Sequence, residues 1–259
     1  MSTKNFSLVV CLIPLLPLAL ACAIYFGDLQ ISSFLLINGF ARDIPDTAWA
    51  FLTFLGNGWG IFAISFPLLL LAPRLLTAGI FAGVISAIAS STLKPVFDLP
   101  RPAGTLLDGS FHLIGEPLLY KAFPSGHTLT AFAIASALYF ACAKSKRGPM
   151  LWLFIAASLV GLSRIAVGAH WLTDVLAGAG VGLWCGMLGE KLSELVKDHY
   201  LAPQKIWPRF IAIGGLVTIY ALLTQTMDLV LNQPLQYACA GLIAVTLVLF
   251  IKAQTSKAA

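Results

Sequence analysis

Residues 149–190 read PMLWLFIAASLVGLSRIAVGAHWLTDVLAGAGVGLWCGMLGE and contain two long apolar runs joined by a short polar segment. Each run, 149–168 and 171–190, is about as long as the roughly 20 residues with which a helix crosses a bilayer. The whole chain has this character, since 59% of its 259 residues are hydrophobic and 10% are charged. A soluble domain is roughly half apolar and a quarter charged. We therefore expect an integral membrane protein and exclude a soluble enzyme, a disordered chain and a nucleic-acid-binding domain.

Other apolar runs of spanning length complete the prediction of an all-α, polytopic transmembrane helix bundle. The six further candidate spans are 7–27, 48–72, 74–93, 125–143, 208–226 and 235–251. Gly56-Asn57-Gly58 interrupts the second span of the chain, so its start is not fixed by the sequence. Segment 29–41 is too short to cross a bilayer and is expected at the membrane interface.

Lys and Arg gather on one side of the membrane when the N-terminus is placed in the cytoplasm and the spans alternate. Eleven of these residues then lie on the inner side and five on the outer side, as the positive-inside rule requires. This orientation puts both termini in the cytoplasm and the connection 94–124 on the outer side. Five prolines interrupt that connection, so it is not expected to form a long helix.

Two polar groups flank the outer connection, where charges close to a membrane are costly and therefore suggest function. Lys94 and Arg101 follow the third span, and the sequence Pro-Ser125-Gly126-His127 opens the fourth. Free amides and the helix dipole make a helix N-terminus an anion site, and His127 could exchange a proton there. Taken singly, the two groups also fit a basic helix end and an ordinary capped helix.

A third polar group lies in the turn between the fifth and sixth spans. His170 and Asp174 are four residues apart and are expected to share a helix face, with Arg164 just upstream. A carboxylate beside an imidazole N–H fixes the tautomer and leaves the other nitrogen as a nucleophile. Alone, this also fits a satisfied polar pair. The same row continues with three glycines that should let another helix pack closely: Gly178, Gly182 and Gly186.

Together the three groups supply three cations, a helix N-terminus, a proton donor and an oriented nucleophile. Phosphoryl transfer needs these parts, because charge on the equatorial oxygens must be neutralised. The cations would take the role that Mg²⁺ has in other enzymes. The sequence has no cluster of carboxylates for a metal and no CxxC pair, so we expect neither a metal nor another cofactor.

The patterns Lys-x6-Arg-Pro, Pro-Ser-Gly-His and Ser-Arg-x5-His-x3-Asp, in that order, resemble the three signature motifs of the type 2 phosphatidic acid phosphatase family. That family is related to vanadium haloperoxidases. The motifs lie in 94–174, and with their helices the resemblance covers roughly 50–192. It implies a six-helix phosphatase core, here within 1–205, followed by two additional spans in 206–259 whose role is unknown.

The resemblance also implies a role for each motif residue. Five residues would bind the phosphate: Lys94, Arg101, Ser125, Gly126 and Arg164. His170 would attack phosphorus and become phosphohistidine, and Asp174 would orient it. His127 would protonate the leaving oxygen and then activate water.

These expectations describe a metal-independent phosphatase acting on a lipid phosphate or diphosphate at the outer face of a bacterial cytoplasmic membrane. Candidate substrates are undecaprenyl diphosphate, phosphatidylglycerol phosphate, phosphatidic acid and lipid A. A lipid phosphotransferase, which passes the group to another lipid such as lipid A, shares the first half-reaction and stays open. A transporter or packing subunit is disfavoured by the intact motifs, and a haloperoxidase by the apolar chain. The sequence leaves the oligomeric state open.

Overall fold

The computed structural model describes residues 6–255, and in that range the chain forms helices and loops without a β-strand. The α-helices are α1 (Leu8–Leu12), α2 (Leu15–Phe26), α3 (Gln30–Ala41), α4 (Asp46–Phe54), α5 (Gly58–Ser65), α6 (Leu68–Leu71), α7 (Pro73–Phe97), α8 (Gly126–Ala141), α9 (Arg147–Met150), α10 (Trp152–Ala166), α11 (Leu172–Ser193), α12 (Ile206–Thr224) and α13 (Gln233–Thr255). Short 3-10 helices in the connections are η1 (Pro102–Gly104), η2 (Lys144–Lys146), η3 (Asp198–Leu201) and η4 (Val230–Asn232).

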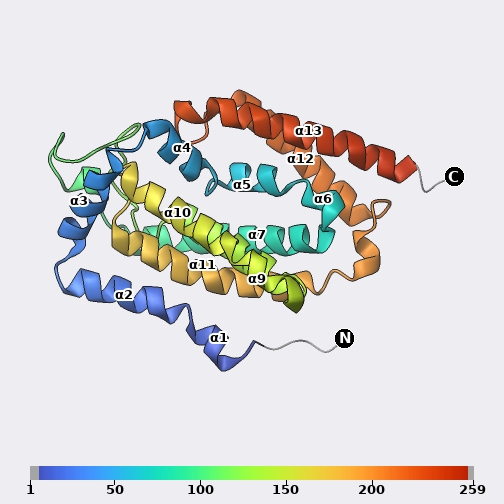
Figure 1. Cartoon of the computed structure of the whole chain (residues 1–259), viewed down its shortest axis with the longest axis horizontal. Coiled ribbons are helices and arrows are strands. Elements are labelled where there is room, and N and C mark those ends of the chain that lie inside the picture. The colour runs from blue at the N-terminus through green and yellow to red at the C-terminus, as the bar shows by residue number, and fades with distance from the viewer. Residues whose placement is uncertain (1–5, 256–259) are drawn as a thin grey trace.

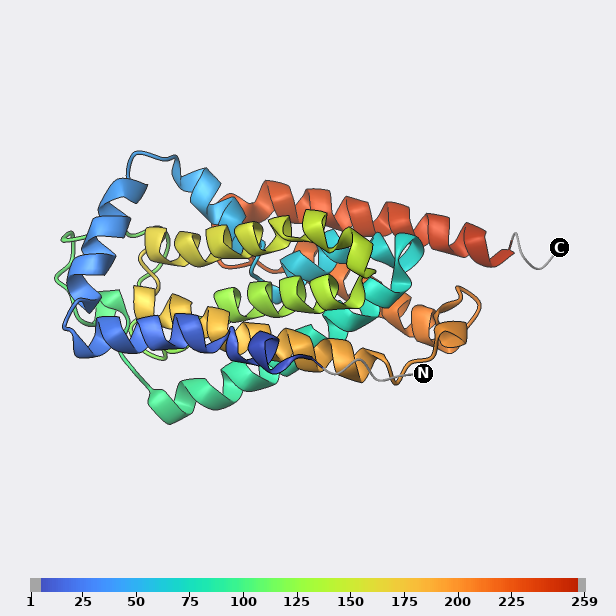
Figure 2. The same cartoon turned by 60° about the horizontal axis from the view of Figure 1, so that its bottom comes forward.

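Most of the expected spans are present as long apolar helices. Within the described residues, 6 helical segments are long and apolar enough to cross a membrane, and 7 if α4 and α5 form one bent span. Those two helices meet at 74°, so the Gly56-Asn57-Gly58 interruption becomes a sharp bend. Segment 29–41 forms the short helix α3, which lies across one end of the bundle (Figures 1 and 2).

The fourth expected span, 125–143, is shorter than predicted. The helix α8 has 16 residues, because the backbone is extended at Ser125 and again at Cys142. It packs against α7, α10 and α11, so protein rather than lipid surrounds much of its surface. A helix in that position does not need the full roughly 20 residues of a lipid-exposed span.

The third span is longer than predicted. Helix α7 continues through Lys94 and Pro95 to Phe97, where the left-handed Asp98 (φ 38°) ends it. A proline in the last turn removes one amide and clashes with the preceding turn, but α7 accommodates it two residues before its end. The outer connection therefore starts at residue 98 rather than 94, and the rigid end of α7 positions Lys94.

The centre of the bundle is the close contact of α11 with α8 and α7. A Cβ atom added to Gly178, Gly182 or Gly186 would come within 2.7 Å of a backbone oxygen of α8 or of its N-cap residue Ser125. The glycine row of α11 therefore lets the two backbones approach closely, as the sequence predicts. This contact fixes the N-terminal ends of α8 and α11 side by side.

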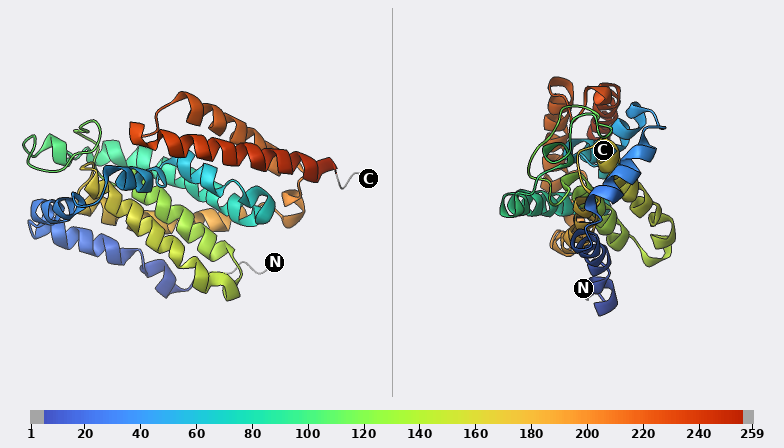
Figure 3. Two further views of the ribbon diagram at one scale, coloured as in Figure 1. Left: turned by 45° about the horizontal axis from the view of Figure 1, so that its top comes forward. Right: turned by 90° about the vertical axis from the view of Figure 1, so that its left-hand side faces the viewer.

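The last two helices form a hairpin on one side of this centre, and α1 and α2 lie on the opposite side (Figure 3). Helix α13 contacts α5 and α6, and α12 contacts α5. Their shared core includes the fully buried side chains of Phe66, Leu222 and Ile243. The loop 98–125 lies at the end of the bundle with α3, whereas α1 and the end of α13 point to the other end (Figure 1). All three sequence motifs meet at the end that carries the loop.

Candidate active site

The eight candidate residues come from four helix ends and two connections. Lys94 lies in the last turn of α7 and Arg164 in the last turn of α10. Ser125 and Gly126 open α8 together with His127, and Asp174 lies in the first turn of α11. The two remaining residues, Arg101 and His170, belong to the connections before η1 and α11.

The expected pairing of His170 with Asp174 is present, but the shared helix face is not. His170 precedes the N-cap residue Trp171, whose backbone is extended, so the imidazole stands before α11. Its Nδ1 is 3.2 Å from Oδ2 of Asp174, and the same oxygen accepts the Trp171 amide at 2.9 Å. Asp174 thus caps the helix and holds the imidazole with one carboxylate. Both side chains are buried.

The hydrogen bonds of His170 define its tautomer. Nη1 of Arg101 is 3.3 Å from Nε2 of His170, and a guanidinium can only donate. Nε2 therefore presents its lone pair, and Nδ1 carries the proton that it donates to Asp174. A neutral imidazole with this tautomer has its nucleophilic nitrogen turned toward the cations.

The charge state of His170 follows from its surroundings. Burial lowers the pKa of the imidazole well below its usual value, and the nearby charges of Arg101, Arg164 and Lys94 lower it further. The ring is therefore neutral at physiological pH, which is the form that can attack phosphorus.

Loop carbonyls hold the guanidinium of Arg101. Its Nε donates to the Tyr120 oxygen at 2.8 Å, and Nη1 donates to the Ala169 oxygen at 3.0 Å. Nη2 donates to the Lys121 oxygen at 3.3 Å. The loop 98–125 therefore folds back and fixes a buried cation beside the His170 ring.

Arg164 is a buried cation with few hydrogen-bond partners. Its side chain is buried, and Nη1 donates to Oγ1 of Thr53 at 3.4 Å, while Thr53 also pairs with Ser163 at 2.9 Å. Its buried Nε has no hydrogen-bond partner among the described residues. A buried N–H without a partner is costly, so this nitrogen is a donor suited to an anionic ligand.

The N-terminus of α8 offers backbone donors, because the side chain of Ser125 does not cap it. Ser125 occupies the N-cap position, but its side chain accepts no backbone amide of the first turn and instead accepts the Thr128 hydroxyl at 3.0 Å. A Cβ atom on Gly126 would lie 3.6 Å from Nζ of Lys94. The ammonium therefore lies directly over the start of α8, beside its free amides.

The structure adds one charged residue that the sequence analysis missed. Nε2 of His127 is 3.1 Å from Oδ2 of Asp228, which lies between α12 and α13. Nδ2 of Asn57, at the bend between α4 and α5, donates to the same oxygen at 2.9 Å. Asp228 is the only acidic residue after Asp198. An isolated charge beside two membrane spans was the available signal.

The assembled groups match a phosphate rather than a metal ion. Among the described residues, no group of three or more His, Cys, Asp or Glu side chains lies close enough to hold a metal. The site instead combines three cations, helix N–H donors, a neutral imidazole and a second histidine paired with a carboxylate. This arrangement can bind a phosphoryl group, attack it and protonate a leaving oxygen.

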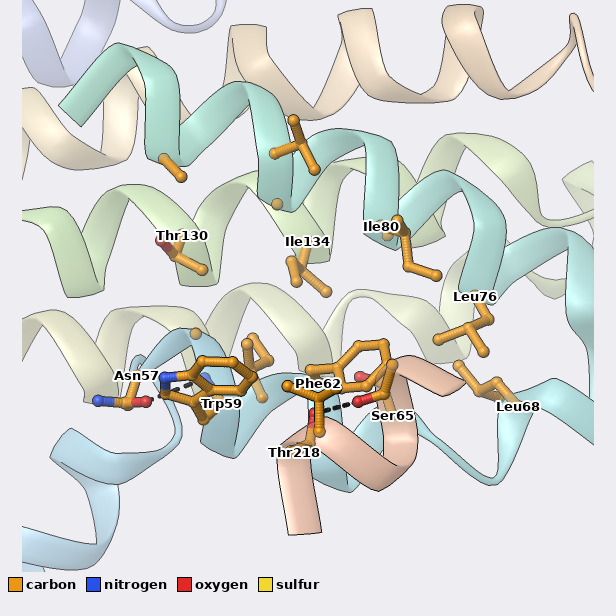
Figure 4. A pocket seen from close by; sticks show the side chains of 18 of the residues that line it. Asn57, Trp59, Phe62, Ser65, Leu68, Leu76, Ile80, Thr130, Ile134 and Thr218 are labelled. Atoms are coloured by element: carbon orange, nitrogen blue, oxygen red, sulfur yellow. Dashed lines mark hydrogen bonds between the residues drawn. The ribbon is translucent and has the colours of Figure 1, made fainter. Parts of the chain in front are cut away.

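An apolar cavity of about 810 Å³ lies beside the site, between α5, α7, α8 and α12 (Figure 4). It begins at Asn57 and Thr130, and Thr130 is less than one helical turn from His127. It continues toward Leu76 near the other end of α7. The cavity is open at its side, because the lining residues Trp59 and Phe210 are 40% and 67% exposed.

Comparisons with known proteins identify relatives of this chain. A profile of the PAP2 superfamily matches residues 71–191. The lipid A 1-phosphatase of Porphyromonas gingivalis is 44% identical over 80 residues, 29% of this chain and 17% of that protein. The undecaprenyl-diphosphatase BcrC of Bacillus subtilis is 31% identical over 125 residues, 48% of this chain and 60% of that protein. The chain therefore spans less than two thirds of the length of either relative.

A solved structure extends the match. The crystal structure of Aquifex aeolicus LpxE superimposes with a TM-score of 0.56 and 32% identity, and the match covers 63% of this chain and 95% of that one. The segment that the profile matches includes all eight candidate residues, from Lys94 to Asp174. The described residues also form several helices that are long and apolar enough to cross a membrane. The chain belongs to the PAP2 superfamily.

Proposed function

We propose that this protein is an integral membrane phosphatase that hydrolyses a lipid phosphate or diphosphate through a phosphohistidine at His170. The observation that carries the proposal is the orientation of His170. Its Nε2 lone pair faces Arg101, while Asp174 holds the opposite nitrogen. A nucleophile so oriented among cations is suited to a phosphoryl group, whose charge those cations neutralise.

The reaction has two half-reactions. Nε2 of His170 attacks phosphorus, the bond from phosphorus to the lipid oxygen breaks, and that oxygen takes a proton from His127. Water then attacks phosphorus while His127 accepts one of its protons, the bond from phosphorus to Nε2 of His170 breaks, and inorganic phosphate leaves with His170 restored as the neutral imidazole. Lys94, Arg101 and Arg164, with Ser125 and the Gly126 amide, stabilise the negative oxygens in both steps.

The reaction is proposed to need no metal ion. Three cations and the positive end of the α8 dipole would neutralise the phosphate oxygens, and the buried Nε of Arg164 has no hydrogen-bond partner among the described residues. Activity should therefore survive EDTA, and vanadate should inhibit by forming a pentacoordinate analogue on His170. Loss of activity in EDTA that Mg²⁺ restores would overturn this part of the proposal.

The apolar cavity supports a lipid substrate. The cavity starts less than one turn from His127. Along α7 its lining runs from Ala87 to Leu76, which are 11 residues apart, or about 16 Å at 1.5 Å per residue. A hydrocarbon chain could enter from the bilayer past Trp59 and lie along this length (Figure 4). The named relatives act on lipid A and undecaprenyl diphosphate, so these two classes are the first substrates to test.

The active site is proposed to face the outer side of the cytoplasmic membrane. Eleven Lys and Arg residues lie on the inner side of the predicted topology and five on the outer side. Lys94, Arg101 and Arg164 belong to the outer five and lie in the candidate site, so the bias among the remaining cations is steeper. The described ends, α1 and α13, both point away from the site (Figure 1).

Phosphate release from purified protein tests the function. In detergent, the protein should release inorganic phosphate from at least one of lipid A, undecaprenyl diphosphate, phosphatidylglycerol phosphate or phosphatidic acid. His170→Ala should abolish release, and rapid quench with ³²P-labelled substrate at high pH should place the label on the peptide that carries His170. Transfer of the label to a second lipid without free phosphate would favour a phosphotransferase. No release and no transfer from any of them would overturn the proposal.

A further inference from the structure

The connection between α12 and α13 brings a carboxylate to the second histidine of the site. Asp228 lies outside the segment 71–191 that the superfamily profile matches. Its Oδ2 is 3.1 Å from Nε2 of His127, and its side chain is only 21% exposed. The additional hairpin thus reaches into the centre that the family motifs form.

The protein holds Asp228 in this place from both sides. Nδ2 of Asn57 donates to its Oδ2 at 2.9 Å, while Oδ1 of Asn57 accepts the Trp59 amide at 2.9 Å and caps α5. On the other side, the buried Gln236 and Asn232 bond the amide and the carbonyl of Met227 at 3.1 and 3.0 Å. Asp228 itself has a left-handed backbone (φ 60°). A connection fixed in this way is a built feature rather than a loose loop.

The carboxylate is ionised. Burial alone would raise the pKa of Asp228, but the charge and hydrogen bond of His127, the charge of Arg164 and the hydrogen bond of Asn57 together lower it to about 2. A negative acceptor that stays charged over the whole working range of pH stabilises a positive partner.

We propose that Asp228 is a positioning residue that orients His127 and stabilises its protonated form, so that each histidine of the site has its own carboxylate. The proposal rests on the phosphatase function above. One N–H of the His127 imidazolium donates to Asp228 and the other gives its proton to the leaving lipid oxygen. The resulting neutral ring keeps its bond to Asp228 and takes a proton from the water that attacks phosphohistidine.

The other charges around His127 oppose its protonated form. Lys94 from α7, Arg164 from α10 and His170 from before α11 are the cationic or basic groups that face it, and Asp228 is the one carboxylate that interacts with it among the described residues. Without Asp228, the charged groups that face the imidazolium would be the cations Lys94 and Arg164. The proton donor would then be lost at a lower pH, and the ring would be free to rotate.

The test compares Asp228→Asn and Asp228→Ala with wild type on two substrates. A positioned acid contributes typically 10²–10⁴ in rate, so we expect kcat on an alkyl lipid phosphate to fall about 10- to 100-fold. For an activated aryl phosphate, the rate of the first half-reaction, read from the burst of released aryl alcohol, should fall by less than half, because its leaving oxygen needs little protonation. The basic limb of the pH profile should move to lower pH, and Asp228→Glu should recover part of the activity.

Two controls separate orientation from a structural effect. Asp108→Asn changes an exposed carboxylate in the outer loop and should leave kcat on both substrates unchanged. In a His127→Ala background, Asp228→Asn should cost nothing further, because the residue it positions is gone. Vanadate binding and the size-exclusion profile report whether each variant is folded.

The experiment distinguishes failure of the proposed phosphatase function from failure of the role proposed for Asp228. If wild-type protein releases no phosphate from any lipid, the proposed function fails. If wild type is active, equal losses on both substrates, additive losses with His127→Ala or no loss would each overturn the role of Asp228. A gain of activity in Asp228→Ala would also overturn it, because the carboxylate would then be an anion that blocks the phosphate site.

Discussion

At the scale of single residues, the two histidines of the site differ in what surrounds them. His170 is 1% exposed and lies between Asp174 and Arg101, so its tautomer and its direction are fixed. The His127 side chain is 19% exposed and has Asp228 as its hydrogen-bonding partner. A fixed, buried ring suits attack on phosphorus, and a partly open ring suits proton exchange with the leaving oxygen and with water.

The lowered pKa of His170 predicts how activity depends on pH. The neutral, nucleophilic ring is present above its pKa and is lost as the pH falls through it. Because burial and the nearby Arg101, Arg164 and Lys94 charges lower that pKa, activity should persist below the usual imidazole value of about 6.5. Lys94→Gln removes one of the cations and should move the acid limb of kcat/KM to higher pH.

A pH–rate profile of wild type and Lys94→Gln on a soluble aryl phosphate checks this shift. The substrate's own titration is common to both enzymes, so it cancels in the comparison. Lys144→Gln serves as the matched control, because Lys144 is an exposed lysine at the other end of α8. An acid limb that stays in place in Lys94→Gln would show that this cation does not set the charge state of His170.

At the scale of elements, the motif spacing was enough to predict which helix ends meet. The residues of each motif lie at a span terminus, and the glycine row of α11 indicated a close neighbour, which is α8. Helix boundaries were less predictable. Pro95 suggested that α7 would end earlier, but a proline in the last turn displaces few hydrogen bonds. His170 was expected to share a helix face with Asp174, but the helix begins after Trp171, whose amide Asp174 accepts, so His170 lies before it.

The sequence motifs could not predict that Asp228 belongs to the site. Its role comes from a contact with His127, which lies 101 residues away, and spacing along the chain carries no information about it. The sequence did mark the residue, because it is the one acidic group between Asp198 and the end of the chain. The tertiary contact of the α12–α13 hairpin with α5 and α6 was needed to place it.

The cavity between α5, α7, α8 and α12 leads to a prediction about α12. Gly214 lines it, and a Cβ atom there would be 3.8 Å from Phe62, an ordinary contact. Gly214→Phe should therefore fill part of the cavity without straining the backbone. If a lipid chain occupies this space, KM for a long-chain lipid phosphate should rise several-fold while kinetics on a short-chain analogue stay unchanged.

Gly241→Phe on α13 is the matched control for this variant. Gly241 is exposed, and no atom lies within 4 Å of a Cβ atom built there, so the added ring should project outward and leave both substrates unaffected. Equal kinetics of Gly214→Phe on the long and short substrates would show that the hydrocarbon chain lies elsewhere.

At the scale of the whole molecule, the candidate site and the basic connections lie at opposite ends of the bundle. The loop 98–125 and the candidate site lie at one end of the bundle, and η2 and η3 lie near the other (Figures 1 and 2). The basic residue Lys144 belongs to η2, and Lys197 is the N-cap of η3. Large side chains on the outer helices, such as Phe210 and Ile251, are exposed. A surface of this kind is stable against lipid rather than water, so the bundle crosses the membrane with one defined end toward each side.

The orientation of this bundle can be measured directly. A single cysteine at Leu107, which is 82% exposed in the loop 98–125, is expected to react with an impermeant thiol reagent in intact cells. One at Ser145, in η2 at the opposite end, is expected to react only after the membrane is opened. Both belong in a background without the five native cysteines, with retained phosphatase activity as the sign of a correct fold.

A permeant thiol reagent provides the control, because it should label both positions in intact cells. Labelling of Ser145→Cys but not Leu107→Cys by the impermeant reagent would invert the topology and place the active site in the cytoplasm. Such a result would leave the chemistry of His170 intact, because that depends on contacts within the bundle. It would exclude every substrate whose phosphate is exposed only on the outer side, so the orientation of the fold decides which lipid this phosphatase can reach.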